Sequence, residues 1–290
     1  MKMTMVNLFL ILFVFYCSTL AFFFVKQSSF IFLTTGISKS QESLLRKFSH
    51  FEVNINHNGF NLHGWLINRE ISAEHPLIIY YGGNAEEISH NLFNLENYEK
   101  ESLLFMNYRG YGKSTGSPSQ SSLFSDALFI FDHISDIYSI PSTNIILMGR
   151  SLGSAVATYV AKQRHVRAVI LITPFDSLVN IAKEHYSFFP VKLLLRHPFD
   201  SVQIAPEITS PMIAIIAEQD RIISNEQSVN LVEHWGMKSH YVTIKDADHN
   251  SISNYPEYWN TVRLFLSKMA KRSIWSMCHK AMITNKMVKD

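Results

Sequence analysis

Short apolar runs recur along the middle of the chain, and this feature constrains the fold most. The runs that read as strands are residues 76–81, 102–106, 145–148, 166–172, 212–217 and 241–244. The segments that read as helices are residues 85–98, 122–138, 152–162, 225–235 and 256–269. Continuous apolar runs are typical of strands covered on both faces, and their alternation with helices predicts a mainly parallel sheet of the α/β class.

The first strands follow a different pattern. Residues 51–56 alternate polar and apolar side chains, as a half-buried strand does. Asn58 and Gly59 then form a typical hairpin sequence, and residues 62–67 are expected to be the partner strand. This pattern predicts an antiparallel hairpin at the N-terminal edge of the sheet, with helices on both faces of the sheet. A chain of 290 residues is long enough for one such domain and short for two.

A serine between two glycines follows the strand predicted at 145–148. Residues 149–153 read GRSLG, and small helix-forming residues come next. The glycines either make a tight turn only, or they hold Ser151 out as a nucleophile. The position between an apolar strand and an Ala/Gly-rich helix favours the nucleophile.

A serine nucleophile needs a base, and the base needs an acid that orients it. Asp220 follows the strand predicted at 212–217, and His249 follows the strand predicted at 241–244. Ligands of such sheets bind beyond the carboxyl ends of the strands. We therefore predict Ser151 as nucleophile, His249 as base and Asp220 as the orienting acid.

Other acidic residues compete for the role of Asp220. Asp176 also follows a predicted strand and is the alternative acid. Asp246 and Asp248 lie close to the candidate histidine in the chain, and both are expected to form its loop and to be solvated.

An acyl-transfer site also needs N–H donors for the oxyanion. One predicted donor is the amide of Leu152, which follows the nucleophile at the start of a helix. The second is expected in the loop after residues 76–81, which reads GGNA. We favour the Asn84 amide, with Gly83 or Ala85 as alternatives. The simpler interpretation is that the Gly82-Gly83 pair only turns the chain.

Three motifs together carry a resemblance to a known family. They are GGNA at 82–85, NYRGYGKSTGSPS at 107–119 and GRSLGSA at 149–155. In these motifs the chain resembles membrane-tethered serine hydrolases of the α/β-hydrolase superfamily, described as lysophospholipase-like, serine aminopeptidase-like or protein-depalmitoylase-like. The resemblance covers about residues 50–270, and it implies the α/β-hydrolase fold with a triad in the order Ser, Asp, His. Many relatives have His where this chain has Gly82, so a side chain that could brace the loop is absent.

Two further features have competing interpretations. Residues 112–114 read GKS, as a phosphate-binding loop ends, but the glycine required five residues earlier is Asn107, so no nucleotide site follows. The resemblance implies that residues 109–119 are structural and pack beside the site. Arg150 either binds a substrate carboxylate or phosphate, or holds the turn to the scaffold, and we favour the structural role.

The N-terminal segment at residues 5–25 carries no formal charge and is rich in Phe and Leu. About 21 residues that rise about 1.5 Å each are enough to cross a bilayer core. A cleaved signal peptide should end in a small-x-small site, and here three phenylalanines follow the best candidate. The sequence predicts an uncleaved, single-pass membrane anchor. The alternatives are a signal peptide and a core helix.

The predicted organisation has four parts. They are an N-terminal anchor at 1–27, a connector at 28–50, a catalytic domain at 51–270 and a basic tail at 271–290. Within the catalytic domain, residues 175–206 form a short aromatic, apolar excursion. It is expected to be either a helix packed on the core or a small lid that shapes an acyl pocket. The tail is expected either to contact anionic lipid or to fray.

Composition narrows the function further. The formal net charge of +2 gives no strong attraction to nucleic acid, so no nucleic-acid partner is expected. Cys17, one of two cysteines, lies in the apolar segment, so no disulfide framework is expected. Metal-binding motifs are absent from the sequence, and no cofactor and no metal are expected.

The predicted function is that of a membrane-anchored serine hydrolase. It would cleave esters or thioesters through an acyl-enzyme, with a small-molecule or lipid ester or an acylated protein as substrate. The alternatives are a serine peptidase of the same fold, a catalytically silent membrane scaffold, and a secreted soluble esterase.

Overall fold

The computed structural model describes residues 5–68, 71–72, 75–98 and 100–287, with side chains up to residue 271. Eight strands form one sheet in the order β1-β2-β4-β3-β5-β6-β7-β8. The strands are β1 Glu52–His57, β2 Phe60–Ile67, β3 Leu77–Tyr81, β4 Ser102–Met106, β5 Ile145–Arg150, β6 Ala168–Ile172, β7 Met212–Ala217 and β8 Ser239–Ile244. β2 runs antiparallel to β1 and β4, and β3 to β8 run parallel to one another. The predicted parallel sheet with an antiparallel hairpin edge is confirmed.

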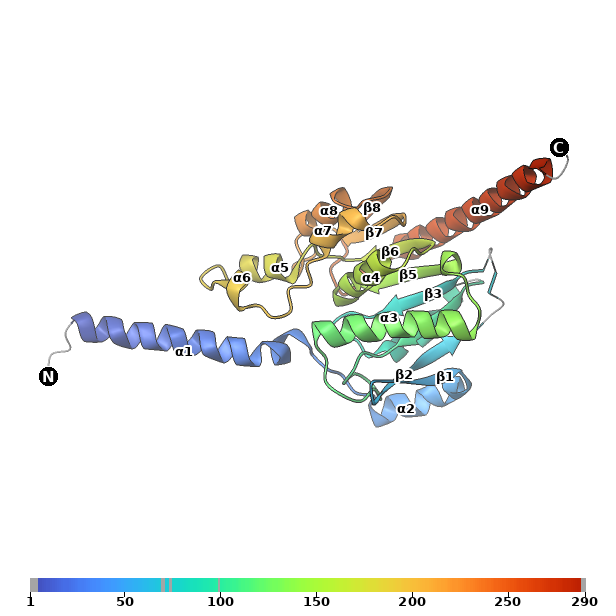
Figure 1. Cartoon of the computed structure of the whole chain (residues 1–290). Coiled ribbons are helices and arrows are strands. Elements are labelled where there is room, and N and C mark those ends of the chain that lie inside the picture. The colour runs from blue at the N-terminus through green and yellow to red at the C-terminus, as the bar shows by residue number, and fades with distance from the viewer. Residues whose placement is uncertain (1–4, 69–70, 73–74, 99, 288–290) are drawn as a thin grey trace.

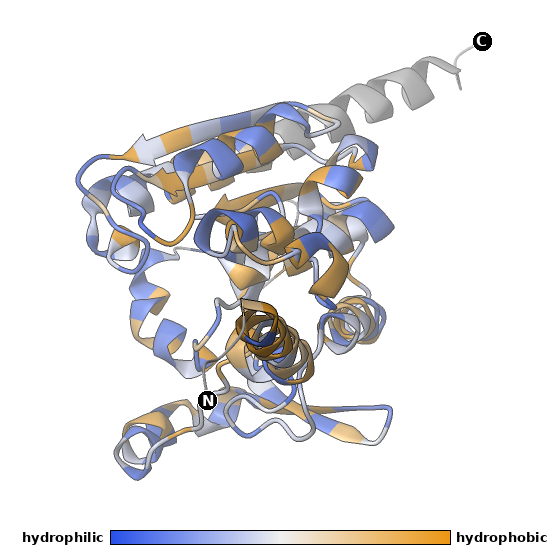
Figure 2. Cartoon of the chain, turned by 90° about the vertical axis from the view of Figure 1, so that its left-hand side faces the viewer, coloured by the Kyte–Doolittle hydropathy of each residue, from blue (hydrophilic) through white to orange (hydrophobic). Residues whose placement is uncertain are grey.

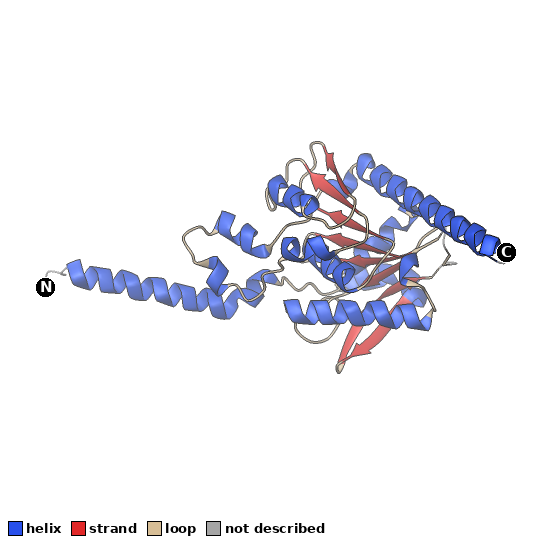
Figure 3. Cartoon of the chain, turned by 45° about the horizontal axis from the view of Figure 1, so that its top comes forward, coloured by secondary structure: helices blue, strands red, loops and turns tan. Residues whose placement is uncertain are grey.

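Helices cover both faces of this sheet (Figure 3). On one face, α3 and α4 pack with α8; on the other, the 3-10 helix η2 packs with α9. The helices are α1 Met5–Ile31, α2 Lys39–Leu45, α3 Gln120–Ile137, α4 Leu152–Gln163, α5 Leu178–His185, α6 Val191–Leu194, α7 Ser201–Ile204, α8 Asn225–Glu233 and α9 Pro256–Met287. The 3-10 helices are η1 Arg46–Phe51, η2 Ile88–Asn97, η3 Ser142–Asn144, η4 Ala205–Glu207 and η5 Ile252–Asn254.

Some predicted boundaries differ from the structure. The segment 85–98 is a 3-10 helix, η2, that begins only at Ile88, because the residues before it form a loop at the end of β3. Within the predicted connector, Ser38 and Gln41 form a capping box that starts α2. α9 continues to Met287, so the boundary predicted between domain and tail falls inside one helix. The predicted lipid contact of the tail lies outside the described side chains.

The longest apolar helix is α1, which projects away from the sheet (Figure 1). Figure 2 shows it mostly in the colour of hydrophobic residues. It is long and apolar enough to cross a membrane, and no residue of its most apolar 18-residue window is buried in the chain. An N-terminal signal sequence can also meet these criteria of length and composition.

Candidate active site

Ser151 lies at the sharp turn between β5 and α4. Its backbone has φ 49° and ψ −115°, a conformation that is strained for a residue with a side chain. Two glycines make this turn possible by letting the backbone pack closely. A Cβ atom on Gly153 would collide with the carbonyl oxygen of Tyr81, and one on Gly149 would collide with Gly153. The turn therefore holds Ser151 at the carboxyl end of β5, as the GRSLG motif predicts.

The structure brings the three predicted site residues together. The Nε2 atom of His249 lies 3.0 Å from the Oγ atom of Ser151. The Nδ1 atom of His249 lies 2.7 Å from the Oδ2 atom of Asp220. The side chains of His249 and Asp220 are both buried. Because a carboxylate accepts the Nδ1 proton, Nε2 is left as the acceptor that faces the serine hydroxyl.

Asp220 is itself held in place. Its Oδ1 atom accepts hydrogen bonds of 2.9 Å from the amide N–H groups of both Ile222 and Ile223. The alternative acid, Asp176, accepts hydrogen bonds from the side-chain amides of Asn180 and Asn230 instead. The geometry therefore favours Asp220 over Asp176 as the acid that orients the histidine.

The two aspartates before His249 shape its loop. Asp248 accepts hydrogen bonds from the amide N–H groups of Asn250, over 2.8 Å, and Ser251, over 2.9 Å. The hydrogen bonds from Ser251 and then Asn250 lower the pKa of Asp248. Asp246 has a positive φ of 59° and accepts a hydrogen bond from Gln219. Both arrangements agree with the loop-forming roles expected for these residues.

The amides expected to bind an oxyanion differ in whether another group already accepts their N–H. The N–H of Leu152 opens α4 and, like the N–H of Asn84, donates to no acceptor in the described parts of the chain. The N–H of Gly83 donates to the Oε2 atom of Glu86 over 2.6 Å, and that of Ala85 donates to the Oδ1 atom of Asn84 over 3.0 Å. Of the three amides considered for the second donor, only the Asn84 N–H is not already hydrogen-bonded to an acceptor among the described residues.

Glu86 was not singled out in the sequence, yet it braces this loop. Besides the Gly83 amide, its carboxylate accepts hydrogen bonds from the Tyr80 hydroxyl at 3.0 Å and the Asn91 side chain at 2.8 Å. These contacts supply bracing that the histidine replaced by Gly82 could have given. Only its position, three residues after Gly83, hints at this role, because a side chain at that distance can reach back to a loop amide.

The segment at 109–119 packs beside the same loop. The hydroxyl of Tyr108, just before the segment, donates to the carbonyl oxygen of Gly82 over 2.9 Å. The hydroxyl of Tyr111 donates to the Oδ1 atom of Asn84 over 2.9 Å. Burial raises the pKa of both tyrosines, so both remain protonated donors near neutral pH. These contacts agree with the structural role that the resemblance implies.

Arg150 links the same loops from the other side of the turn. Its guanidinium lies 3.5 Å from the Glu86 carboxylate and donates to the His249 carbonyl oxygen and the Asn250 side chain. Burial disfavours its charge, but the neighbouring Tyr80 and Glu86 outweigh burial and raise the pKa of Arg150. These contacts match the structural interpretation of Arg150.

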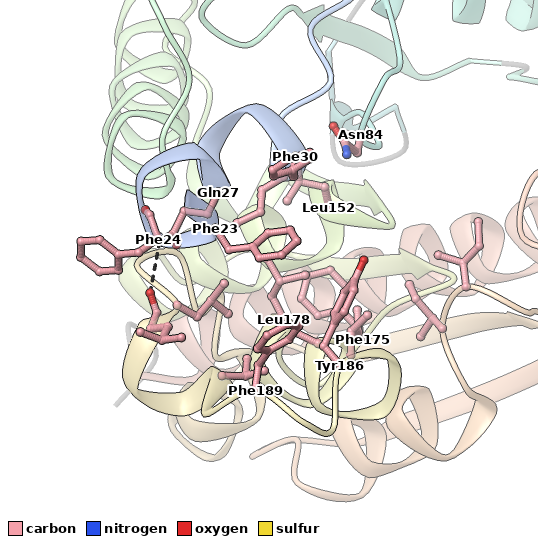
Figure 4. A pocket seen from close by; sticks show the side chains of 18 of the residues that line it. Phe23, Phe24, Gln27, Phe30, Asn84, Leu152, Phe175, Leu178, Tyr186 and Phe189 are labelled. Carbon is pink, nitrogen blue, oxygen red and sulfur yellow. Dashed lines mark hydrogen bonds between the residues drawn. The ribbon is translucent and has the colours of Figure 1, made fainter. Parts of the chain in front are cut away.

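A cavity of about 530 Å³ opens beside the serine. Ser151, Leu152 and Asn84 line one part of it, and apolar side chains line most of the remainder. These come from the last turns of α1, including Phe23 and Phe30, and from the excursion around α5 and α6 (Figure 4). α5 has no fully buried residue, and its Leu178 and Ile181 pack partly buried against the core and also line the cavity, so this helix both packs on the core and forms part of the cavity wall.

No cluster of His, Cys, Asp and Glu side chains that could hold a metal ion occurs among the described residues.

Comparison with known proteins identifies the family of the chain. A family model described as serine hydrolase matches residues 131–268, a range that contains Ser151, Asp220 and His249. An uncharacterised protein of Mycobacterium tuberculosis is 30% identical over 198 residues, covering 66% of this chain and 69% of its own length. The alpha/beta hydrolase domain-containing protein WAV2 of Arabidopsis thaliana is 28% identical over 235 residues, covering 73% of this chain and 76% of its own length.

Solved structures are similar in fold at low sequence identity. An alpha-beta hydrolase from Vibrio vulnificus has a TM-score of 0.64 and 17% identity, covering 78% of this chain and 86% of its own. Est1E from Butyrivibrio proteoclasticus, solved with ferulic acid bound, has a TM-score of 0.60 and 17% identity, covering 77% of this chain and 99% of its own. By its sequence relatives and its fold, the chain belongs to the α/β-hydrolase superfamily and is a hydrolase of the serine hydrolase type.

Proposed function

We propose that this protein cleaves carboxylic esters or thioesters of acyl-chain substrates through an acyl-enzyme on Ser151. The observation that carries the proposal is the hydrogen-bonded series from Ser151 through His249 to Asp220. His249 takes the proton from the Ser151 hydroxyl as its oxygen attacks the carbonyl carbon. The same proton then goes to the leaving group when the carbon–heteroatom bond breaks. Water, activated by His249, releases the acid and restores the serine.

The oxyanion of each tetrahedral intermediate is bound by the amides of Leu152 and Asn84. The free N–H groups of these residues and their position on the wall of the same cavity support this assignment. A donor that is fixed before charge develops stabilises the transition state by about 3 kcal/mol.

An acyl substrate is favoured by the cavity, whose lining is mostly aromatic and aliphatic. A serine peptidase would use the same three residues on an amide. A peptide backbone, however, presents polar groups to its site, and this lining offers few partners for them.

We further propose that α1 is retained as a single-pass membrane anchor. The absence of charge from its residues 5–25 and its exposed surface support a span over a core helix. Its last turns form part of the cavity wall, so removing α1 as a signal peptide would open the cavity on one side.

Labelling by a fluorophosphonate probe tests the proposal. The full-length protein in detergent should be labelled, whereas Ser151→Ala and His249→Ala should not. Ser121→Ala, which alters an exposed serine near the start of α3, is the matched control and should be labelled like the wild type. Circular dichroism checks that each variant is folded.

A folded wild type that resists the probe would contradict the proposal and favour the scaffold alternative. If labelling succeeds, esters, thioesters and amides of one acyl group separate esterase from peptidase. Faster cleavage of the amide would favour the peptidase.

A further inference from the structure

The C-terminal half of α1 and residues 186–195 lie against each other next to the cavity (Figure 4). We infer that residues 186–195 enter the same membrane leaflet as this half of α1, and that the cavity takes the acyl chain of a membrane lipid ester directly from that leaflet. This inference rests on the proposed function for the identity of the scissile bond.

Specific polar contacts join the two segments. Gln27, the one α1 residue that is buried, donates from Nε2 to the carbonyl oxygen of Leu194 over 3.1 Å. Its Oε1 atom accepts the amide N–H of Arg196 over 2.7 Å. Next to Gln27 in the chain, the Ser28 hydroxyl lies 3.0 Å from the Nε2 atom of His197. A helix that only tethered the domain would not need such side-chain pairing.

Aromatic contacts extend the junction between α1 and residues 186–197 toward the N-terminus of α1. The hydroxyl of Tyr16 donates to the carbonyl oxygen of Phe188 over 3.1 Å. The ring of Phe189 stacks on that of Tyr16 at 6.2 Å and approaches that of Phe23 at 5.6 Å. The Phe189 ring therefore lies between the levels of Tyr16 and Phe23 along the helix, and the Phe188 backbone lies at the level of the Tyr16 hydroxyl.

This level sets the depth of the excursion in a membrane. From Tyr16 to Val25, the last residue of the uncharged segment, an α-helix rises about 14 Å. That rise is close to half of a hydrocarbon core of roughly 30 Å. If α1 spans the membrane, Phe188 reaches toward the middle of the bilayer from the side of the hydrolase domain.

The surface of the excursion fits a lipid environment. Phe188 is 90% exposed and Leu193 is 85% exposed, beside an apolar helix that is itself exposed. Large apolar side chains that are exposed together at one end of a domain mark a contact with a membrane or a partner. Because these side chains adjoin the apolar helix α1, we assign the contact to the membrane. Lys192 is the one charged residue between them, and its long side chain can extend to the interface.

The cavity lies between these two segments and reaches Ser151. Its wall includes Phe23 and Phe30 of α1 and Tyr186 and Phe189 of the excursion. An acyl chain that enters from the leaflet can therefore lie along apolar side chains throughout, with its carbonyl carbon at the serine. This arrangement makes the last turns of α1 part of the substrate site.

The first experiment measures how deeply residue 188 lies in the bilayer. The full-length protein carries Cys17→Ser and Cys278→Ser and a nitroxide on either Phe188→Cys or Tyr138→Cys, in phosphatidylcholine vesicles. Tyr138 is exposed at the end of α3 and is the control. Electron paramagnetic resonance should show the label at 188 accessible to oxygen and shielded from a water-soluble nickel chelate, with the reverse at 138. Equal access of the chelate to both labels would overturn membrane insertion.

The second experiment measures, in the same vesicles, how strongly the enzyme prefers a long acyl group to a short one. The ratio of hydrolysis rates for hexadecanoyl and butanoyl p-nitrophenyl esters should fall about tenfold in Phe23→Trp, because the larger side chain fills the path of the longer chain. Phe15→Trp is the matched control, since Phe15 is on the same helix, is 71% exposed and does not line the cavity. The same ratio in wild type and Phe23→Trp would overturn the acyl path. A wild type that cleaves neither ester and resists the fluorophosphonate would instead overturn the proposed function, and the label at 188 would still decide insertion.

Discussion

The Nη2 atom of Arg150 donates a 3.1 Å hydrogen bond to the backbone carbonyl oxygen of His249. Arg150 directly precedes the candidate nucleophile, so the side chain of one residue supports the loop that carries the candidate base. The same guanidinium contacts Glu86, which holds the amide of Gly83. A single cation thus connects the serine turn, the histidine loop and the loop with the proposed oxyanion donor.

Replacement of Arg150 should therefore impair catalysis by misplacing groups. We expect Arg150→Ala to lower kcat about tenfold to hundredfold with a smaller change in KM, because misplacement of a catalytic group by about 1 Å has effects of this size. Neutral esters and esters that carry a carboxylate should lose activity equally. A loss confined to the anionic ester would show instead that Arg150 binds the substrate.

Replacing each aspartate with asparagine shows whether Asp220 or Asp176 orients His249. Asp220→Asn should lower kcat by about ten-thousandfold, because the amide can no longer select the Nδ1–H form of His249. Asp176→Asn should retain the activity of the folded enzyme, since Asp176 bonds to asparagines in the structure. Rates normalised to folded protein provide the measurement, and a larger loss in Asp176→Asn would reverse the assignment.

The side chain of Asn84 should matter although only its backbone amide is assigned to the oxyanion. Its Oδ1 atom accepts hydrogen bonds from the Leu33 amide, the Ala85 amide and the Tyr111 hydroxyl. Asn84→Ala should lower kcat by up to about a hundredfold by releasing the loop, which is the lower limit for loss of one oxyanion donor. Tyr111→Phe removes one of the three bonds and should have a smaller effect. The opposite order in steady-state kcat would contradict this role.

The junction between α1 and the excursion should weaken in acid. Burial, with a smaller effect from Arg196, lowers the pKa of His197 below its ordinary value of 6.5. On acidification, the unfolded chain therefore takes up this proton at a higher pH than the folded chain does. The free energy of unfolding keeps the full contribution of His197 above about pH 6.5 and falls as the pH drops toward the pKa of the folded state. Thermal unfolding midpoints of the full chain at about pH 7.5 and about pH 5.5 should show this loss.

His197→Gln offers a matched test of that pH dependence. A glutamine can keep both the contact with Ser28 and the hydrogen bond accepted from the Gln120 amide, and it does not titrate. Part of the acid-induced decrease in midpoint should disappear in this variant. Burial also lowers the pKa of His63, so a decrease of the same sign should remain. A variant with the full wild-type decrease would exclude His197 as a contributor.

Local sequence patterns predicted the strands well. β4 and β7 occupy the predicted residues because each is a continuous apolar run bounded by polar residues. The type and start of η2 could not be predicted in this way. Its first amide, that of Ile88, donates to the Asn107 side chain, and its beginning therefore depends on a loop distant in sequence.

The chain order of Ser151, Asp220 and His249 also predicted which residues would meet. Their placement after parallel strands brings them to one edge of the sheet, because the carboxyl ends of such strands share that edge. The same argument also admits Asp176, which follows β6, so the choice of acid needed the structure. Glu86, Tyr108 and Tyr111 were not assigned to the site. Their contacts join separate loops, and no local periodicity reports such contacts.

The sequence by itself determined the α/β alternation, the turn that exposes Ser151 and an apolar segment long enough to span a bilayer. These depend on spacing and hydrophobicity within one segment. Only the tertiary structure decided that Asp220 bonds to His249, that the Asn84 amide is unclaimed, and that α1 lines the cavity next to Ser151. These depend on groups that are far apart in the chain, such as Gln27 and Leu194, and folding alone brings them within hydrogen-bonding distance.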